Sequence, residues 1–475
     1  MPVSPDYRPD PRFATLGGEF ADAVAPAEFP QATIRFRNQR AAASVGLGTL
    51  TDDEWRAHFA RFEPLADNQS QPLAMRYHGH QFGVYNPDLG DGRGFLFAQL
   101  REIGTGRLLD LGTKGSGQTP WSRTADGRLT LKGGVREVLA TAMLEALGVP
   151  TSRSFSLIET GEDLERGDEP SPTRGAVLTR LSHSHIRFGT FQRHAALDRA
   201  DLVGQLVDHV VETYYAALTG APNRAAALLV AAVERAARLT ARWMAAGFVH
   251  GVLNTDNMNI TGESFDYGPY RFLPKNDPNF VAAYFDHQGL YSFGRQPEAV
   301  FWNLRQLAGT LTLISDQAPL VDALNGFAGA YRTALTAALL DRLGVRARDA
   351  EADASLAGAA LRALAEGGEA LRWEPFFFDW FGGSASRARA MGGVRAAHYG
   401  GVAFTEFRRL LADFEPDRPE RLDGAYFARP EPQELLYDEI EALWAPITER
   451  DDWSAFDVKL SAIEAARAAW GLAGP

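Results

Sequence analysis

Short apolar stretches separated by turn residues characterise the first half of the chain. The apolar stretches 94–100 and 107–112 flank the turn-like segment 104–106 (GTG), which predicts two antiparallel strands. A third candidate strand covers 175–181. We therefore expect this part of the chain to build a small sheet.

A helical pattern lies between the second and third predicted strands. Apolar residues recur every four positions from Val135 to Leu147, and Gly148 and Pro150 follow directly. This spacing predicts an amphipathic helix, and the glycine and proline predict where it stops.

From residue 198 onward, Ala- and Leu-rich windows with helical periodicity dominate. The clearest expected helices are 201–219, 223–246, 299–313, 433–444 and 456–470, with a Gly/Ser-rich break at 382–386. The pattern predicts an α+β protein in which a small β-rich lobe precedes a mostly helical lobe. The expected divisions are an N-terminal extension at 1–75, the β-rich lobe at 76–180, the helical lobe at 181–345 and a helical C-terminal region at 346–475.

Composition narrows the classes of partner. The 475 residues carry 48 Lys and Arg against 60 Asp and Glu, a formal net charge of -12, which argues against nucleic acid as a partner. The chain has no cysteine, which excludes disulfides, thiolate metal sites and cysteine nucleophiles.

Nothing in the sequence points to a membrane. Residues 1–20 lack a continuous apolar segment, so we expect no secretory signal and a cytoplasmic location. The longest apolar run, 225–233, is far shorter than the roughly 20 residues that span a bilayer.

Glycines precede the first predicted strand in the segment 89–94 (LGDGRG). At Gly90 and Gly92, the missing side chain would let backbone N–H groups approach a phosphate chain. The alternative is a tight turn that simply enters the strand.

Lys114 and Glu137 follow in the order found in the small lobe of protein kinases. Lys114 ends the second predicted strand, and Glu137 lies early on the predicted helix. In kinases such a lysine reaches phosphate oxygens and pairs with the helix glutamate. The alternative is a surface lysine and an unrelated solvated glutamate.

The segment 250–257 (HGVLNTDN), followed by Asp266-Tyr267-Gly268, is similar to a kinase catalytic loop and metal motif. Val252 stands where kinases carry the catalytic aspartate, and Asn257 stands at the position of the metal-binding asparagine. The carboxylate of Asp266 suits Mg²⁺ or Mn²⁺. In the alternative interpretation, these polar residues only cap turns or satisfy hydrogen bonds in the core.

Losing the general base lowers the rate of a kinase reaction by roughly 10²–10⁴-fold. An ATP site without that base therefore implies a protein that only binds ATP or one that catalyses a different reaction. Arg180 and Arg187 follow the third predicted strand and can each grip a phosphate with two hydrogen bonds. With Arg93, they could hold the β- and γ-phosphates as a leaving group. Alternatively, they pair with surface carboxylates.

Long motifs in a fixed order strongly resemble the selenoprotein O family, also called YdiU. The resemblance runs from about 13 to 313 and rests on 77–83 (YHGHQFG), 89–93 (LGDGR), 114–120 (KGSGQTP), 126–128 (DGR), 136–137 (RE), 250–257 and 266–269 (DYGP). It implies a protein-kinase-like bilobal fold that binds ATP in a reversed orientation. It also implies transfer of AMP to Ser, Thr or Tyr hydroxyls of protein substrates.

The resemblance also implies roles for individual residues. Asp256 would be the proton acceptor, and Asn257 and Asp266 would bind Mg²⁺ or Mn²⁺. The nucleotide would be bound by Gly90, Gly92, Arg93, Lys114, Asp126, Gly127, Arg180, Arg187 and Asp266, with Glu137 supporting Lys114 through an ion pair.

The chain departs from the family in two places. Many members carry a selenocysteine or cysteine near the C-terminus, whereas this chain ends 470–475 (WGLAGP) without a thiol. The segment 426–432 (YFARPEP) also differs from the expected family sequence. Three alternatives remain open: an ATP-binding pseudoenzyme without transfer, residual kinase activity, and UMP transfer from UTP with manganese.

Overall fold

The computed structural model describes residues 4–167 and 169–472, so the end of the thiol-free segment 470–475 lies outside the described residues. The strands are β1 (Ala21–Ala23), β2 (Thr33–Arg37), β3 (Leu73–Met75), β4 (Gly79–Gln81), β5 (Val84–Asn86), β6 (Leu96–Arg101), β7 (Leu108–Lys114), β8 (Leu129–Thr130), β9 (Arg153–Leu164), β10 (Thr173–Ser182), β11 (Phe248–Val249) and β12 (Arg271–Phe272). The helices are α1 (Gln39–Ser44), α2 (Asp52–Phe59), α3 (Leu131–Ala146), α4 (Phe188–Ala196), α5 (Ala200–Tyr214), α6 (Arg224–Ala245), α7 (Gln296–Leu311), α8 (Gln317–Asn325), α9 (Phe327–Leu343), α10 (Ala350–Gly367), α11 (Trp373–Trp380), α12 (Arg387–Gly392), α13 (Val402–Leu411), α14 (Tyr437–Arg450) and α15 (Ser454–Trp470).

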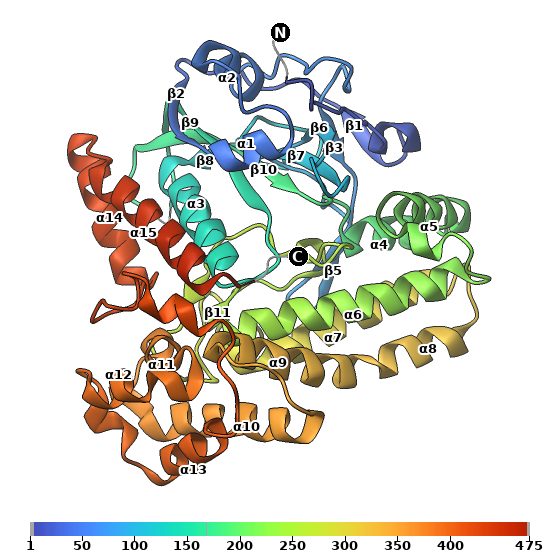
Figure 1. Ribbon diagram of the computed structural model, residues 1–475. Helices are drawn as coiled ribbons and strands as arrows, with labels where there is room; N and C mark the ends of the chain where they lie inside the picture. The colour runs from blue at the N-terminus through green and yellow to red at the C-terminus, as the bar shows by residue number, and fades with distance from the viewer. Residues whose placement is uncertain (1–3, 168, 473–475) are drawn as a thin grey trace.

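An antiparallel sheet forms the upper part of the molecule in Figure 1. Its strand order is β1-β3-β6-β7-β10-β9-β2, with β8 paired to β10. The strands predicted at 94–100, 107–112 and 175–181 are confirmed as β6, β7 and β10. Strand β9 lies outside those predictions, which relied on apolar stretches, because serines interrupt the apolar residues of its first half and polar residues dominate its second half.

Helices cover both faces of this sheet. Neighbouring residues of a strand point to opposite faces, and Val177 and Leu178 of β10 show the result. Val177 packs into a core with Trp55 of α2, whereas Leu178 packs into a core with Val135 of α3. The sheet is thus held between α1 and α2 on one side and α3 on the other (Figure 1).

Helix α3 confirms the helix predicted around 135–147. It begins where the side chain of Thr130 accepts a hydrogen bond from the Gly133 N–H (3.1 Å), and Gly148, with φ 72°, follows its end. Burial of its apolar side chains fixes it to the sheet, and each one, such as Leu139, stabilises the fold by about 1.5–3 kcal/mol. Glu137 is consequently held beneath β7.

The remaining helices build the lower part of the molecule. The helices predicted at 201–219, 223–246, 299–313, 433–444 and 456–470 are confirmed as α5, α6, α7, α14 and α15, although α5 ends at Tyr214 and α14 begins at Tyr437. Helix α6 begins after Asn223, whose side chain accepts from the Ala226 N–H (3.0 Å). Helices α10 to α13 form a separate block at the bottom (Figure 1). The structure confirms the mixed α+β class.

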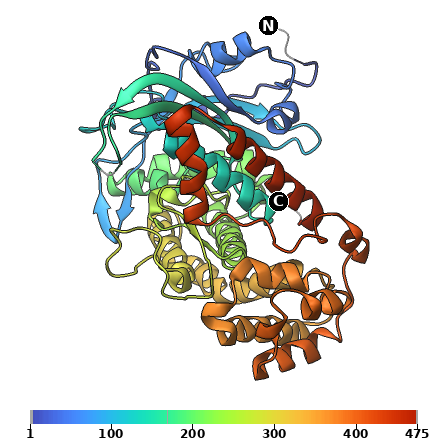
Figure 2. The same ribbon diagram turned by 90° about the vertical axis from the view of Figure 1, so that its left-hand side faces the viewer.

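The C-terminal helices α14 and α15 return to the sheet and lie against α3, as Figure 2 shows. Lys132 of α3 contacts Glu441 of α14 at 2.7 Å. The loop between α14 and α15 reaches the sheet, where Asp451 pairs with Arg35 of β2 and Arg174 of β10. The end of the chain thus braces the helix that carries Glu137.

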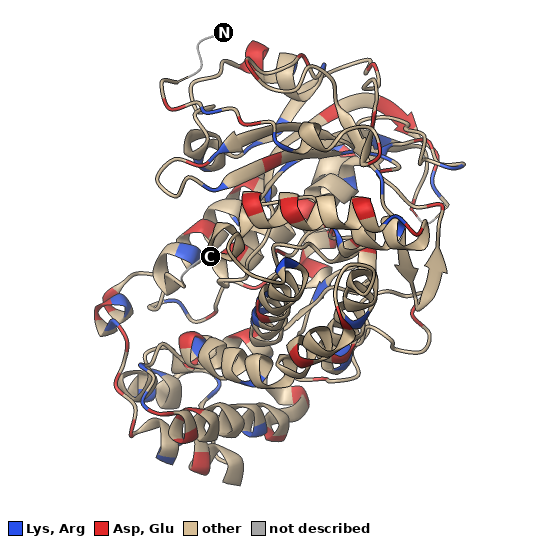
Figure 3. Ribbon diagram, turned by 90° about the vertical axis from the view of Figure 1, so that its right-hand side faces the viewer, with Lys and Arg blue, Asp and Glu red and all other residues tan. Residues whose placement is uncertain are grey.

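Acidic and basic residues are interspersed over both parts of the molecule (Figure 3). None of the helices in 4–167 and 169–472 is both long enough and apolar enough to cross a bilayer.

Candidate active site

A cavity of about 430 Å³ lies between the glycine loop 89–94, the loop after β7 and the segments 252–257 and 266–269. These segments are distant in sequence, and only the fold brings them to one place. Seven of the predicted site residues line the cavity: Gly90, Gly92, Arg93, Lys114, Asp256, Asn257 and Asp266.

Lys114 is the centre of an ion-pair cluster at the floor of this cavity. Its ammonium group contacts a carboxylate oxygen of Glu137 and lies 2.7 Å from Oδ1 of Asp266. In the sheet register Lys114 faces Leu178 and Arg180 faces Gly112, so both cations point toward the side of α3. Arg180 Nη1 also donates to Asp266 Oδ1, at 3.2 Å.

The backbone of Asp266 adopts a left-handed conformation, with φ 64°, which aspartate tolerates better than most residues. Burial alone would raise the pKa of its carboxyl, but the charges of Lys114, Arg180 and Arg93 hold that pKa well below its usual value. Asp266 is therefore ionised at neutral pH.

Arg187 is buried beside this cluster. Its Nη2 lies 3.0 Å from Oδ1 of Asp91, and its Nη1 donates to the hydroxyl of Tyr77 at 2.8 Å. Neither Arg180 nor Arg187 pairs with a surface carboxylate, because both are buried. The residues of these contacts are called the inner ion pairs below: Lys114, Glu137, Asp266, Arg180, Arg187 and Asp91.

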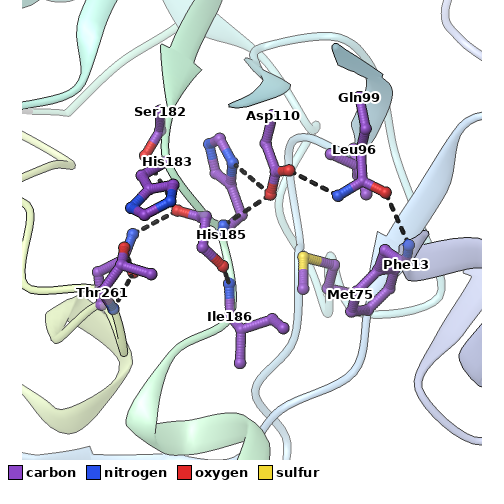
Figure 4. A network of polar contacts seen from close by, with 12 residues as sticks. Phe13, Met75, Leu96, Gln99, Asp110, Ser182, His183, His185, Ile186 and Thr261 are labelled. Atoms are coloured by element: carbon purple, nitrogen blue, oxygen red, sulfur yellow. Dashed lines mark hydrogen bonds and ion pairs between the residues drawn. The ribbon is translucent and has the colours of Figure 1, made fainter. Parts of the chain in front are cut away.

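A buried polar network supports the segment that leads to Arg187 (Figure 4). The His185 N–H donates to Oδ2 of Asp110 at 2.8 Å, and the side-chain amide of Gln99 donates to Oδ1 at 2.7 Å. The amide oxygen of Gln99 in turn accepts from the Phe13 N–H at 2.6 Å. These contacts fix the connection between β10 and α4, and with it the start of the Arg187 side chain.

The segment 250–257 follows β11 and turns through a short 3₁₀-helix at Thr255–Asn257. The Nε2–H group of His250 donates to the carbonyl of Phe265 at 3.0 Å, which joins this segment to the Asp266 motif. The Asn257 side chain donates to the carbonyl of Val252 at 3.0 Å. Asn257 also lines the cavity.

Asp256 lines the cavity with only 8% of its surface exposed. Its Oδ1 atom is buried and has no hydrogen-bond partner. Burial raises the pKa of Asp256 to about 6, although the nearby Arg187 charge works in the opposite direction. A buried carboxylate oxygen without a partner is costly, so this atom is suited to receive a proton or a ligand.

Close packing also explains why glycine occupies positions in the 89–94 loop. A Cβ atom at Gly90 would lie 2.3 Å from Cγ of Trp121, and one at Gly92 would lie 2.8 Å from the Trp121 carbonyl oxygen. The loop after β7 therefore lies directly against the glycine loop. The tight packing of these two loops requires glycine in addition to any approach to phosphate.

Two predicted nucleotide-binding residues lie beside the cavity rather than on its wall. Asp126 accepts from the Arg128 N–H at 2.9 Å and pairs with Arg166 at 2.8 Å. Gly127 has φ 71°, and a Cβ there would lie 2.3 Å from the backbone of Gly117. In this structure both residues shape the loop after β7.

The donor atoms of the cavity fit a hard divalent cation. Among residues 4–167 and 169–472, no cluster of three or more acidic, histidine or cysteine side chains could hold a metal ion. Magnesium, however, is typically bound by one or two carboxylates together with substrate phosphates and water. Asp256, Asn257 and Asp266 all line one cavity, and their two carboxylates and one side-chain amide fit that requirement.

Sequence patterns did not single out four other residues of the site. Asp91 and Tyr77 hold Arg187, while Trp121 and Arg123 line the cavity from the loop after β7. Asp91 and Tyr77 lie inside motifs already noted, but no spacing rule assigned them a partner. Their partners are at least 96 residues away in sequence.

Together, the fold and the cavity define an α+β protein with a buried lysine–glutamate pair beside acidic and amide oxygens. The family described as "Protein adenylyltransferase SelO" matches residues 6–464. Because the match spans nearly the whole chain, this protein belongs to the SelO family.

Relatives from several cyanobacteria agree with this assignment. The chain is 54% identical to "Protein nucleotidyltransferase YdiU" of Synechococcus elongatus over 340 residues, which cover 71% of this chain and 68% of the relative. It is 46% identical to the protein of that name from Gloeobacter violaceus over 461 residues, covering 95% and 93%. With the one from Synechocystis, it shares 44% identity over 466 residues, covering 94% and 96%.

Proposed function

We propose that this chain is a protein adenylyltransferase, which transfers AMP from ATP to Ser, Thr or Tyr hydroxyls of proteins and releases pyrophosphate. The observation that carries the proposal is the Asp256 carboxyl group, which lines the same cavity as Lys114 and Asp266 and whose buried Oδ1 atom has no hydrogen-bond partner among the described residues. Val252, at the position of the kinase base, offers no proton acceptor. The description of the family and the printed names of the relatives support nucleotidyl transfer.

We also propose that the architecture is a kinase-like bilobal fold. Residues 76–180, with α3 and the strands from β6 to β10, would be the small lobe, to whose sheet the N-terminal segment adds β1, β2 and β3. Residues 181–345 would be the helical lobe. The contact between Lys114 and Glu137 supports this proposal, because it joins a strand to the helix beneath it as in kinases.

In the proposed reaction, Asp256 accepts the proton of the acceptor hydroxyl. The hydroxyl oxygen then forms a bond to the α-phosphorus, and the bond from that phosphorus to the bridging oxygen of the β-phosphate breaks. Pyrophosphate leaves with the electron pair, held by Arg93 and the cations of the inner ion pairs. A pKa of about 6 leaves Asp256 largely ionised at neutral pH and still basic enough to take the proton.

Asn257 and Asp266 would hold Mg²⁺ or Mn²⁺. When bound, such an ion would neutralise phosphate charge and polarise phosphate oxygens. Lys114 and Arg180 hold the Asp266 carboxylate in its ionised form, which is the form that can bind a cation.

Labelled nucleotides test the proposal. Purified protein is incubated with Mg²⁺ or Mn²⁺, a cell extract, and ATP labelled at either the α- or the γ-phosphate. We expect α-label, without γ-label, to become covalently attached to protein. Covalent γ-label would instead mean phosphorylation, and ATP binding without any attached label would mean a pseudoenzyme. Preferential labelling from α-labelled UTP would mean UMP transfer.

A substitution at Asp256 tests the assigned base. We expect Asp256→Asn to lower AMP transfer by roughly 10²–10⁴-fold, because a general base contributes about that much. ATP affinity, measured by calorimetry, should change by less than about threefold, since the amide keeps the size of the side chain. Asp266→Asn should weaken nucleotide binding as well, and equal loss of binding in both variants would contradict the role of Asp256.

A further inference from the structure

The three cations of the inner ion pairs, of which Lys114 lines the cavity, are already neutralised by carboxylates of the protein. The inner ion pairs contain three cations and three carboxylates, and the Asp256 carboxylate adds another negative charge nearby. A nucleoside triphosphate with one divalent cation still carries about two negative charges. Burying that charge requires additional cations, because an uncompensated buried charge is strongly unfavourable.

Two further arginines line the cavity and can supply this charge. Arg93 and Arg123 are both exposed and both contribute to the cavity wall. Within the described part of the chain, neither guanidinium has an ion-pair or hydrogen-bond partner. The two arginines come from the two loops that pack against each other, the glycine loop and the loop after β7.

The loop that carries Arg123 is firmly tied to the glycine loop. The Thr119 hydroxyl donates to the Asp91 carbonyl at 2.6 Å, and the Ser122 hydroxyl donates to the Gly92 carbonyl. At the base of the loop, the Gly115 N–H donates to the Arg93 carbonyl at 2.6 Å. The backbone that presents Arg123 is therefore fixed relative to the predicted phosphate-binding loop.

Arg123 itself has a backbone conformation that arginine rarely adopts. Its φ is 54°, in the left-handed region, which is uncommon for residues other than glycine, asparagine and aspartate. Such strain persists only where surrounding contacts enforce it, and it often occurs at ligand-binding positions. Here the contacts of Thr119 and Ser122 hold the tight turn.

We propose that Arg123 binds the phosphate chain of the nucleoside triphosphate, and that it supplies, together with Arg93, the positive charge that the inner ion pairs lack. This inference rests on the proposed function of the cavity. Arg123 would then strengthen the binding of nucleoside triphosphates relative to nucleoside monophosphates. It would also lie where it can hold the pyrophosphate as it leaves.

Arg123→Asn tests this role. Asparagine tolerates a positive φ, so the variant removes the guanidinium and keeps the turn. The readout is calorimetric binding of ATP, AMP and inorganic tripolyphosphate in the presence of Mg²⁺. We expect ATP and tripolyphosphate to bind about tenfold or more weakly and AMP to change by less than about twofold, because hydrogen bonds to charged groups are the strong ones. Arg123→Lys should restore part of the loss.

A matched control and three outcomes make the test decisive. Arg238→Asn changes an exposed arginine of α6 that does not line the cavity, and this variant should bind all three ligands as the unchanged chain does. Equal weakening of AMP and ATP by Arg123→Asn would mean a collapsed loop and overturn the inference. Unchanged ATP and tripolyphosphate binding with a higher KM for the acceptor protein would place Arg123 at the acceptor instead and also overturn it. Absence of tripolyphosphate binding by the unchanged chain would overturn it too.

The same experiment separates this inference from the proposed function. If triphosphate binding depends on Arg123 but no α-label reaches protein, the inference holds and AMP transfer fails. If α-label reaches protein equally well with and without Arg123 at limiting ATP, AMP transfer holds and the inference fails.

Discussion

At the scale of single residues, two aspartates of the cavity show how surroundings decide chemistry. Asp266 touches Lys114 and Arg180, which hold its pKa well below the usual value. Asp256 has a buried oxygen without a partner, and burial raises its pKa to about 6. The same side chain is therefore suited to hold a cation at one position and to accept a proton at the other.

At the same scale, a buried histidine leads us to predict how the stability of the fold depends on pH. His194 of α4 is 1% exposed, packs 4.5 Å from the ring of Phe20, and has no partner at either ring nitrogen. Burial, with a smaller contribution from neighbouring positive charges, lowers its pKa to about 4, against roughly 6.5 in an unfolded chain. At a pH between these two values, His194 binds a proton in the unfolded chain but not in the folded one, so lowering the pH favours unfolding.

We therefore expect the free energy of unfolding to contain a contribution from His194 that is lost as the pH falls from about 6.5 toward 4. This contribution changes by at most about 1.4 kcal/mol per pH unit. Urea unfolding at pH 7 and pH 5.5 measures it, and His194→Leu should reduce the pH dependence by about 1 kcal/mol over that interval. The same pH dependence in both proteins would show that His194 binds its proton in the folded state.

At the scale of elements, the central feature is the contact between the glycine loop and the loop after β7. Trp121 packs on Gly90, and its indole N–H donates to Asp22 at 2.9 Å. This packing connects two segments that both line the cavity. The position of one loop therefore depends on the other.

Gly90→Ala is expected to lower ATP affinity by about tenfold, because the added methyl group would overlap Trp121 and push the loops apart. In a double-mutant cycle with Trp121→Ala, the two substitutions should be non-additive by about 1 kcal/mol or more. Gly309→Ala is the matched control, since a Cβ there meets open space on α7, and it should leave ATP affinity unchanged. Additive losses would mean that the two loops act independently.

At the scale of the whole molecule, the C-terminal helices connect the end of the chain to the sheet. Asp451 lies between Arg35 at 2.9 Å and Arg174 at 2.6 Å, residues 416 and 277 positions away along the chain. Since α15 also packs against α3, this contact stabilises the support of the Lys114–Glu137 pair.

Asp451→Asn should lower the free energy of unfolding by about 1 kcal/mol, a modest loss because the side chain is half exposed. Asparagine tolerates the left-handed backbone at this position, where φ is 54°. The loss of stability therefore measures the contribution of the negative charge. Asp67→Asn is the control, because Asp67 has φ 53° but no ion pair in the described chain. Equal changes in both variants, measured by chemical denaturation, would mean that the ion pairs contribute nothing.

The sequence alone determined the local elements and the order of the chemical motifs. Apolar stretches bounded by turn residues located β6, β7 and β10, and helical spacing of apolar residues located α3 and the main helices, because these elements must bury apolar side chains. The order of Lys114, Glu137, the segment 250–257 and Asp266 predicted one site, the family resemblance added Asp256, and the fold brings these residues together.

Only the tertiary structure decided how the charges of the site are paired. Arg187 pairs with Asp91, whereas Arg93 and Arg123 line the cavity without an ion pair to any residue that the structure describes. It also showed that Gly90 is required by the packing of Trp121. Local patterns do not encode these contacts, because they depend on the distance between atoms of residues far apart in sequence, which is set when the sheet, the loops and the helices pack together.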